Sequence, residues 1–334
     1  MLSKNLIVAA LALAAGCTRS NGSTDDGGGS GGNGAASDMA TSGQPPAYDF
    51  AGAPPGSDLS TGGALLYDSD GPEQYTTMQM TATGSGKSIP ITVYVPATAG
   101  ARPLVVVSSG LQQPGAAYAP YAKRLASWGI IAVTRDDPGV LSQSQAVADD
   151  IAFVVGWLPG ALSGRVDSGK VGLAGHSRGG MASLLAAEGA LAGKLAGFFG
   201  IDPVDNSGGA AMSLGTIAIP SVFLGETTDG GGSGGSMACA PSDQNYDVLW
   251  HAAPSPSLEI TAVGADHTEF EDPASCSFCT FCTKGSADGA AVLRYSTRYL
   301  MSFFARTLYG DTRIDATLNT AGDVAAGLVQ TQTK

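Results

Sequence analysis

The segment Gly175-His176-Ser177-Arg178-Gly179 restricts what this chain can fold into more than any other segment. The apolar run 171–174 before it predicts a strand, and the sequence after Gly180 predicts a helix over 181–195. Ser177 therefore lies in a tight turn between a strand and a helix, and the two flanking glycines let that turn form without clashes. Such a turn exposes the serine hydroxyl beside the first N–H groups of the helix. This setting predicts that Ser177 is a nucleophile.

Strand and helix patterns alternate on both sides of this turn. The predicted strands are 76–82, 89–95, 104–108, 130–134, 171–174, 197–201, 221–225 and 258–263, and the other predicted helices are 116–128, 144–158, 246–252 and 291–308. Leu104-Val105-Val106-Val107 is apolar without alternation, as in a parallel sheet covered on both faces. The order predicts an α/β fold with a mostly parallel central sheet of about eight strands and helices on both faces. No linker divides residues 72–334, so we expect them to form one catalytic domain.

The first 71 residues differ in composition from the rest. Residues 1–16 have the pattern of an export signal, with Lys4 followed by a short apolar run. Small residues before Cys17 resemble the signal of a bacterial lipoprotein, in which that cysteine carries lipid; the alternative is an ordinary secretory signal with an incidental cysteine. Residues 17–71 are rich in Gly, Ser and Asp and are predicted to be a disordered tether. We therefore expect an exported protein held by lipid on the outer membrane, because Thr18 is not the acidic residue linked to inner-membrane retention.

The charge balance limits the partners of the chain. Its formal net charge is −12, which disfavours nucleic acid because binding to phosphates requires a cationic surface. The chemistry predicted for Ser177 needs neither a metal nor an organic cofactor. We expect a monomer.

Only three histidines are available to act as the base for Ser177. His176 is adjacent to the serine in sequence and badly placed to accept its proton, and His251 is predicted to end a helix. His267 follows the predicted strand 258–263 in a polar loop, where the last strand of such a sheet delivers a general base. His267 is therefore the predicted base.

The acid that would orient this base has two leading candidates. Asp202 follows the strand 197–201 directly and is held by Pro203, whereas Asp229 follows the next strand in a glycine-rich stretch. Both strand ends are suitable; Asp202 is the preferred acid, Asp229 is the alternative, and Asp205 and Glu226 are weaker alternatives. The oxyanion hole is predicted at the backbone N–H groups of Arg178 and of Leu111, which follows the strand 104–108.

Four cysteines remain after Cys17, namely Cys239, Cys276, Cys279 and Cys282. In an exported protein an even number favours two disulfides, and the pairing is open. A four-thiolate zinc site is a weaker alternative outside a reducing compartment. A cross-link in this cluster would brace the loop that carries His267.

Four stretches resemble the chlorophyllase branch of the α/β-hydrolases. These are Gly175-His176-Ser177-Arg178-Gly179-Gly180, Gly200-Ile201-Asp202-Pro203-Val204-Asp205, Cys239-Ala240-Pro241 with Asn245, and Ala265-Asp266-His267. The resemblance implies the α/β-hydrolase fold, ester hydrolysis, and Asp202 as the acid. A wider similarity to cutinase-like polyester hydrolases rests on Ser109-Gly110-Leu111 and on residues 125–130. Those enzymes, however, have Met after the serine, where this chain has Arg178. They also take the acid from the strand end that carries Asp229 here.

The expected activity is therefore hydrolysis of a carboxylic ester, either a small molecule or a polymer, through an acyl-enzyme on Ser177. Two alternatives are an acyltransferase with the same triad and a catalytically inactive hydrolase fold that serves as a surface binding module. The intact pair of Ser177 and His267 argues against the inactive form.

Overall fold

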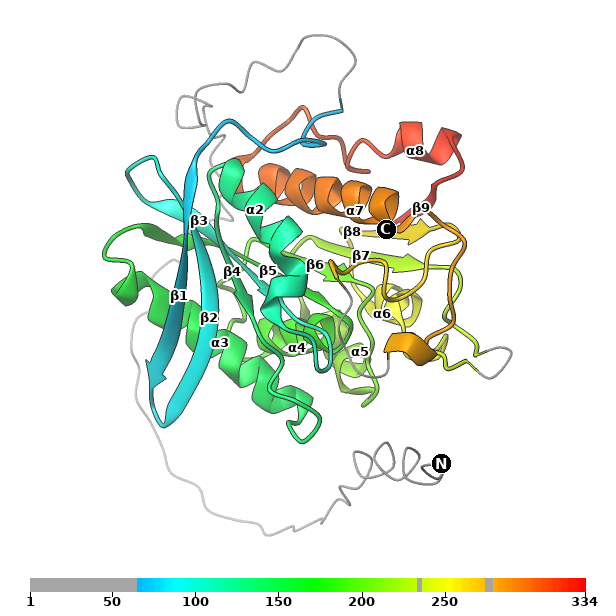
Figure 1. Ribbon diagram of the computed structural model, residues 1–334, viewed down its shortest axis with the longest axis horizontal. Helices are drawn as coiled ribbons and strands as arrows, with labels where there is room; N and C mark the ends of the chain where they lie inside the picture. The colour runs from blue at the N-terminus through cyan, green and yellow to red at the C-terminus, as the bar shows by residue number, and fades with distance from the viewer. Residues whose placement is uncertain (1–64, 233–235, 274–278) are drawn as a thin grey trace, which may run out of the picture. The chain divides into compact units, whose positions relative to one another are not determined.

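The computed structural model describes residues 65–232, 236–273 and 279–334 (Figure 1). The predicted signal peptide, Cys17, most of the predicted tether and Cys276 lie outside the described residues. No helix in the described part of the chain is both long and apolar enough to cross a membrane.

A mixed, mostly parallel sheet organises the described residues. Its nine strands are β1 (Tyr75–Gly84), β2 (Lys87–Pro96), β3 (Arg102–Ser108), β4 (Ile131–Arg135), β5 (Val166–His176), β6 (Gly197–Ile201), β7 (Ser221–Glu226), β8 (Ser257–Ala262) and β9 (Val329–Thr333), in the spatial order β1-β2-β4-β3-β5-β6-β7-β8-β9. The strands from β4 through β8 are parallel, whereas β1, β2 and β9 pair in antiparallel fashion at the two edges. The ends of the parallel strands therefore meet at one edge of the sheet.

Helices cover both faces of this sheet (Figure 1). On one face α2 (Ala119–Ser127) and α7 (Gly289–Phe304) share an apolar core with Val105 and Val107 of β3. On the other face α3 (Ser144–Ala161), α4 (Ser177–Glu188), α5 (Gly209–Ser213) and α6 (Tyr246–Ala252) share a second core with Leu104 and Val106. Alternate residues of one strand thus enter opposite cores, which explains why that strand is apolar throughout.

The predicted fold class is confirmed, since this arrangement is consistent with the α/β-hydrolase fold. Seven α-helices occur in the described residues; the seventh, α8 (Ala321–Ala325), and the strand β9 were not predicted. The polar sequence of β9 gives no strand pattern, because this edge strand buries only Val329 completely. The helix predicted over 181–195 begins earlier, at Ser177 itself, and ends at Glu188.

Candidate active site

Ser177 occupies the junction at which β5 ends and α4 begins. Its backbone φ is +52°. This left-handed conformation is energetically unfavourable for any residue that has a side chain. The neighbouring glycines are needed for close packing: a Cβ on Gly175 would lie 2.4 Å from the carbonyl oxygen of Gly179, and one on Gly179 would lie 2.4 Å from that of Ser108. The spacing Gly-x-Ser-x-Gly is thus the sequence counterpart of a tightly packed strand–turn–helix.

His267 and Asp202 meet at the same edge of the sheet, from the loops after β8 and β6. His267 Nδ1 donates a hydrogen bond of 2.6 Å to Asp202 Oδ2, and their exposed fractions are only 7% and 0%. Burial alone would lower the pKa of His267, but the charge and the hydrogen bond of Asp202 outweigh it and raise that pKa above its usual value. The hydrogen bond to Asp202 uses Nδ1, so it leaves the other ring nitrogen, Nε2, available to a different partner.

Contacts with His176, the residue before Ser177, place His267 close to the serine turn. The His176 and His267 ring centroids are 4.5 Å apart, and Nε2 of His176 donates to the His267 carbonyl oxygen at 3.0 Å. Among the described residues, no hydrogen bond joins the side chains of Ser177 and His267. Such contacts are often long without substrate and shorten when substrate binds.

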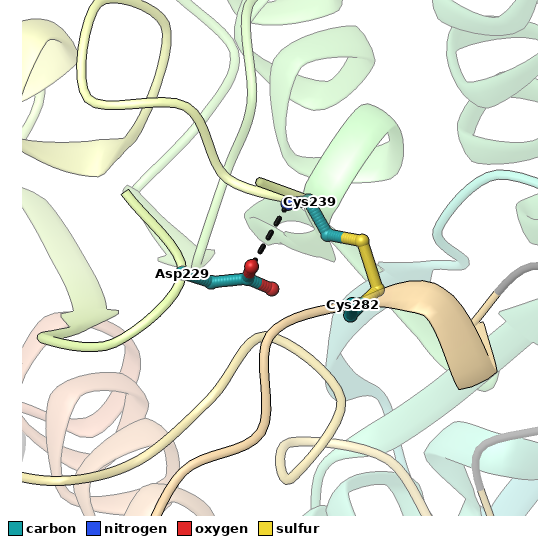
Figure 2. Close-up of side chains that lie close together, drawn as sticks. All are labelled: Asp229, Cys239 and Cys282. Atoms are coloured by element: carbon teal, nitrogen blue, oxygen red, sulfur yellow. Dashed lines mark hydrogen bonds between the residues drawn. A yellow bond between two sulfur atoms is a disulfide. The ribbon is translucent and has the colours of Figure 1, made fainter. Parts of the chain in front are cut away.

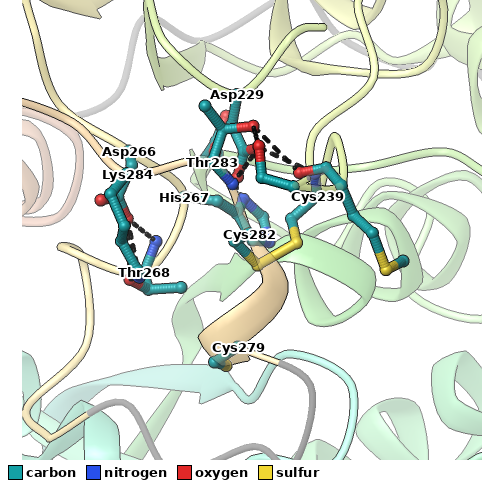
Figure 3. The surroundings of a disulfide bond; sticks show 12 residues. Asp229, Cys239, Asp266, His267, Thr268, Cys279, Cys282, Thr283 and Lys284 are labelled. Carbon is teal, nitrogen blue, oxygen red and sulfur yellow. Dashed lines mark hydrogen bonds and ion pairs between the residues drawn. A yellow bond between two sulfur atoms is a disulfide. The ribbon is translucent and has the colours of Figure 1, made fainter. Parts of the chain in front are cut away.

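Asp229, the alternative acid, is held by a different set of donors (Figures 2 and 3). Its Oδ1 accepts backbone N–H groups of Cys239 at 3.0 Å and Thr283 at 3.2 Å. Burial raises its pKa, and its charge still acts on His267 without a hydrogen bond between them. Asp229 therefore joins the loop after β7 to the chain that follows Cys282.

The prediction of a disulfide is confirmed, because Cys239 and Cys282 are joined across these two segments (Figure 2). Cys279 is also disulfide-bonded, and its partner lies outside the described residues. A carboxylate oxygen of Asp229 and the sulfur atoms of Cys239 and Cys282 lie within 4.8 Å of one another. Because both sulfurs belong to the disulfide, they offer no thiolate to a metal ion.

The weaker acid candidates also bind other groups. Asp205 accepts hydrogen bonds from Ser207 and from the backbone of Ala211, at the start of α5. Glu226 accepts the N–H group of Asp229 at 2.8 Å, and burial together with the charge of Asp202 raises its pKa to about 8. Of the four predicted candidates, only Asp202 is hydrogen-bonded to His267 in the described part of the chain.

The predicted oxyanion donors lie on the two segments that flank the serine. Arg178 is the second residue of α4, so its N–H belongs to the first turn and has no acceptor within the helix. A Cβ on Gly110 would lie 3.3 Å from Cβ of Ser177, which shows how closely the loop before Leu111 passes. The N–H of Leu111 donates to no described residue.

Asp137, which the sequence did not indicate, holds this loop in place. The Arg178 guanidinium donates to Asp137 Oδ2 at 3.0 Å, and Asp137 Oδ1 accepts the N–H of Gln112, next to Leu111, at 3.0 Å. The side chain of one predicted oxyanion residue therefore fixes the loop that carries the other. No sequence motif predicts this contact, because residue 137 follows β4 in a loop without regular structure.

His251, by contrast, belongs to the last turn of α6 and is largely exposed, with Asp247 as its partner at 3.3 Å. Its expected role at a helix end agrees with this position.

Comparison with known proteins places this site in a family. No curated protein matches the chain. The sequence does match the chlorophyllase family over residues 69–324, a span that contains Ser177, Asp202, His267 and the disulfide Cys239–Cys282. The chain therefore belongs to the chlorophyllase family of α/β-hydrolases, which implies that it is a carboxylic ester hydrolase.

Proposed function

We propose that the protein hydrolyses esters through an acyl-enzyme on Ser177, with His267 as general base and Asp202 as the acid that orients it. His267 Nε2 takes the Ser177 proton while Oγ bonds to the ester carbonyl carbon. The bond from that carbon to the alcohol oxygen then breaks, and His267 returns its proton to the leaving alcohol. Water repeats the attack with the same base, which releases the carboxylic acid and restores Ser177.

The observation that carries this proposal is the buried hydrogen bond between His267 and Asp202, at 2.6 Å, beside the turn that presents Ser177. A carboxylate on Nδ1 keeps the proton on that nitrogen, so Nε2 has a free lone pair for the serine proton. The same carboxylate stabilises the imidazolium that forms during the attack.

Charge on the ester oxygen would be stabilised by the N–H groups of Arg178 and Leu111. Removal of one such donor typically raises the barrier by about 3–4 kcal/mol. The link from Arg178 through Asp137 to Gln112 supports this role, since it fixes both donors before substrate arrives.

The substrate is expected to carry a large apolar part. The four most exposed large apolar side chains of the described residues are Leu141 (97%), Met212 (82%), Val140 (54%) and Phe281 (50%). They follow β4, β6 and β8, whose carboxyl ends lie at the same edge as Ser177. Val140 and Leu141 lie between Gly139 and Ser142, whose carbonyl oxygens accept the Arg178 guanidinium at 3.1 Å and 3.0 Å. This apolar pair therefore adjoins the candidate site and favours a lipid-like or polymeric ester over a small polar one. We expect Leu141→Ser to keep turnover of a soluble short-chain ester and to slow turnover of an emulsified long-chain ester.

We also propose that Cys17 carries the lipid that holds the protein on the outer membrane. Metabolic labelling with an alkyne fatty acid tests this, because the wild type should be labelled and Cys17→Ser should not. Label on Cys17→Ser, or none on the wild type, would contradict the anchor.

A fluorophosphonate probe followed by p-nitrophenyl butyrate turnover tests the proposed function. Wild type should be labelled and active, and Ser177→Ala should lose both properties. Ser168→Ala is a matched control, because Ser168 is exposed near the start of the same strand β5 and should keep both. Wild type that is neither labelled nor active would overturn the proposal.

A further inference from the structure

A cluster of buried polar side chains lies beneath the candidate site and has no part in the mechanism above. It consists of His176 (1% exposed), Tyr118 (0%), Gln113 (2%) and Glu271 (8%). They come from the end of β5, from the segment before α2 and from the loop after β8. Buried polar groups are unfavourable unless they form hydrogen bonds with one another. The contacts of this cluster therefore favour the protonation states that pair each donor with an acceptor.

Both ring nitrogens of His176 face oxygen atoms. Nε2 lies 3.0 Å from the carbonyl oxygen of His267, which can only accept, so Nε2 carries a proton. Nδ1 lies 3.0 Å from Glu271 Oε1 and 2.8 Å from the Tyr118 hydroxyl. The hydrogen-bond partner of Nδ1 is the Tyr118 hydroxyl, which can donate its own proton to Glu271 Oε1 at 3.0 Å. A proton on Nδ1 then completes the contact with the Tyr118 oxygen, and the Glu271 carboxylate is the nearby counter-charge.

A neutral His176 with a bare Nδ1 beside an ionised Glu271 satisfies fewer groups. The Tyr118 hydroxyl has one proton, and its oxygen lies 3.0 Å from Glu271 Oε1. If that proton pointed to Nδ1 instead, Glu271 Oε1 would lose this donor and would lie 3.0 Å from an Nδ1 without a proton. Glu271 Oε2 accepts the Gln113 side-chain amide at 2.5 Å, so the carboxylate has donors on both oxygens, as an ionised group requires.

The same cluster connects three parts of the candidate site. His176 precedes Ser177, and its Nε2–H holds the backbone of His267. The Tyr118 hydroxyl accepts the N–H of Gly110, the residue before Leu111, at 3.0 Å. A Cβ on Gly110 would lie 2.9 Å from His176 Nδ1, so the oxyanion loop rests directly on the cluster.

We propose that His176 and Glu271 form a buried ion pair, with His176 protonated on both nitrogens, that positions the base loop and the oxyanion loop relative to Ser177. Its catalytic consequence rests on the proposed function of Ser177, Asp202 and His267, but the protonation state does not. His176 and Glu271 are positioning residues, since both are buried and neither has a role in the bond-making steps of the proposed mechanism. The charged and titratable groups that face His176 are Glu271, Tyr118 and the ring of His267.

Nitrogen-15 NMR of the full-length chain labelled at histidine tests the ion pair without any variant. The chain has only three histidines, so His251→Gln and His267→Gln suffice to assign the signals. We expect both ring nitrogens of His176 to carry protons at neutral pH. A signal from a single protonated ring nitrogen on His176 would overturn the proposal, whether or not the protein hydrolyses esters.

Kinetics test the positioning role. Glu271→Gln should lower kcat about 10–100-fold with KM changed less than about threefold, because a displacement of the base on the order of 1 Å costs about that much. The same variant should lose one ring proton of His176 in the NMR spectrum. Glu269→Gln is the matched control, since Glu269 lies on the same loop, is only partly buried, and accepts the Asp266 N–H through an oxygen that Gln retains.

Wild-type turnover in Glu271→Gln would refute the positioning role. If that variant does not fold, Tyr118→Phe removes only the hydroxyl that links Gly110 to the cluster, and it should lower kcat by a smaller factor with KM unchanged. Unchanged kcat in a folded Tyr118→Phe would count against the link. Fluorophosphonate labelling of the wild type reports separately on Ser177, so failure of the proposed function is distinguished from failure of this inference.

Discussion

Replacement of Asp202 by Asn is the sharpest test of the candidate triad. Asp202 is fully buried, and its Oδ2 accepts the Nδ1 proton of His267 at 2.6 Å. Asn presents either an amide oxygen or an N–H group in that place. If the N–H group faces Nδ1, His267 must carry its proton on Nε2 and cannot accept one from Ser177. The variant changes few atoms, yet it favours the His267 tautomer that carries its proton on Nε2 and cannot act as the base.

The expected loss follows from two contributions. A hydrogen bond to a charged group is worth about 1.5–3 kcal/mol, and stabilisation of the imidazolium in the transition state adds to it. In a serine–histidine–aspartate triad, the corresponding replacement lowers kcat about 10⁴-fold, or roughly 5.5 kcal/mol of barrier. We expect a loss of about 10³–10⁴ in kcat toward p-nitrophenyl butyrate, with KM little changed.

The pH dependence gives a second readout. Asp202 raises the pKa of His267, and the base must be neutral to act, so the acid limb of kcat/KM should lie above the usual histidine value of about 6.5. In Asp202→Asn burial is the largest remaining influence and lowers the pKa of His267, against the smaller raising effects of the charges of Glu271 and Asp229. The residual activity should therefore persist to lower pH than in the wild type.

Asp229→Asn is the matched control for this change. The amide oxygen can still accept the N–H groups of Cys239 and Thr283, so the loop should remain in place and activity should fall no more than a few-fold. A fully active Asp202→Asn together with an inactive, folded Asp229→Asn would refute our assignment and move the acid to the end of β7.

Three further predictions concern stability. Loss of the disulfide in a Cys239→Ser/Cys282→Ser variant should lower the free energy of unfolding by about 4 kcal/mol, because the bond closes a loop with a sequence separation of 43 residues; an unchanged urea midpoint would contradict this. Burial and Asp202 raise the pKa of Glu226 from 4.5 to about 8, so the stabilisation by the protonated form is fully present below pH 4.5 and is lost as the pH rises from 4.5 to about 8. Urea titrations should therefore show a fall of up to about 1.4 kcal/mol per pH unit over this window, which Glu226→Gln reduces. Gly175→Ala should cost about 3 kcal/mol in the same assay, because its Cβ meets a backbone oxygen that cannot move aside; wild-type stability would show that the turn tolerates a side chain.

The fold was largely predictable because its core strands carry unambiguous patterns. All eight predicted strands exist, although most extend further than their apolar centres; β5, for example, begins at Val166 rather than at residue 171. The start of α4 was not predictable, since Ser177-Arg178-Gly179-Gly180 has weak helix propensity and packing against Ser108 and Pro203 decides its conformation. The polar strand β9 exists only through its pairing with β8.

Within the candidate site, the predicted base was chosen from few alternatives. Three histidines in a known order of strands leave one suitable base, and the structure puts His267 beside the serine turn. The pair of His176 and Glu271 left no sequence signal, because 95 residues separate them and neither belongs to a motif that implies the other. Contacts of this kind depend on how loops pack, which periodicity does not encode.

The two candidate acids differ in their surroundings, and the sequence could not reveal that difference. Asp202 and Asp229 both follow parallel strands at the same edge, and both are buried. Asp229 receives N–H groups from Cys239 and Thr283, which the disulfide holds on either side of it, so its carboxylate has the partners that a structural role requires. Asp202 receives the imidazole of His267 instead. The role of a buried carboxylate depends on which donors reach it. The disulfide keeps the donors of Asp229 in place, whereas Asp202 is hydrogen-bonded to His267, the proposed base.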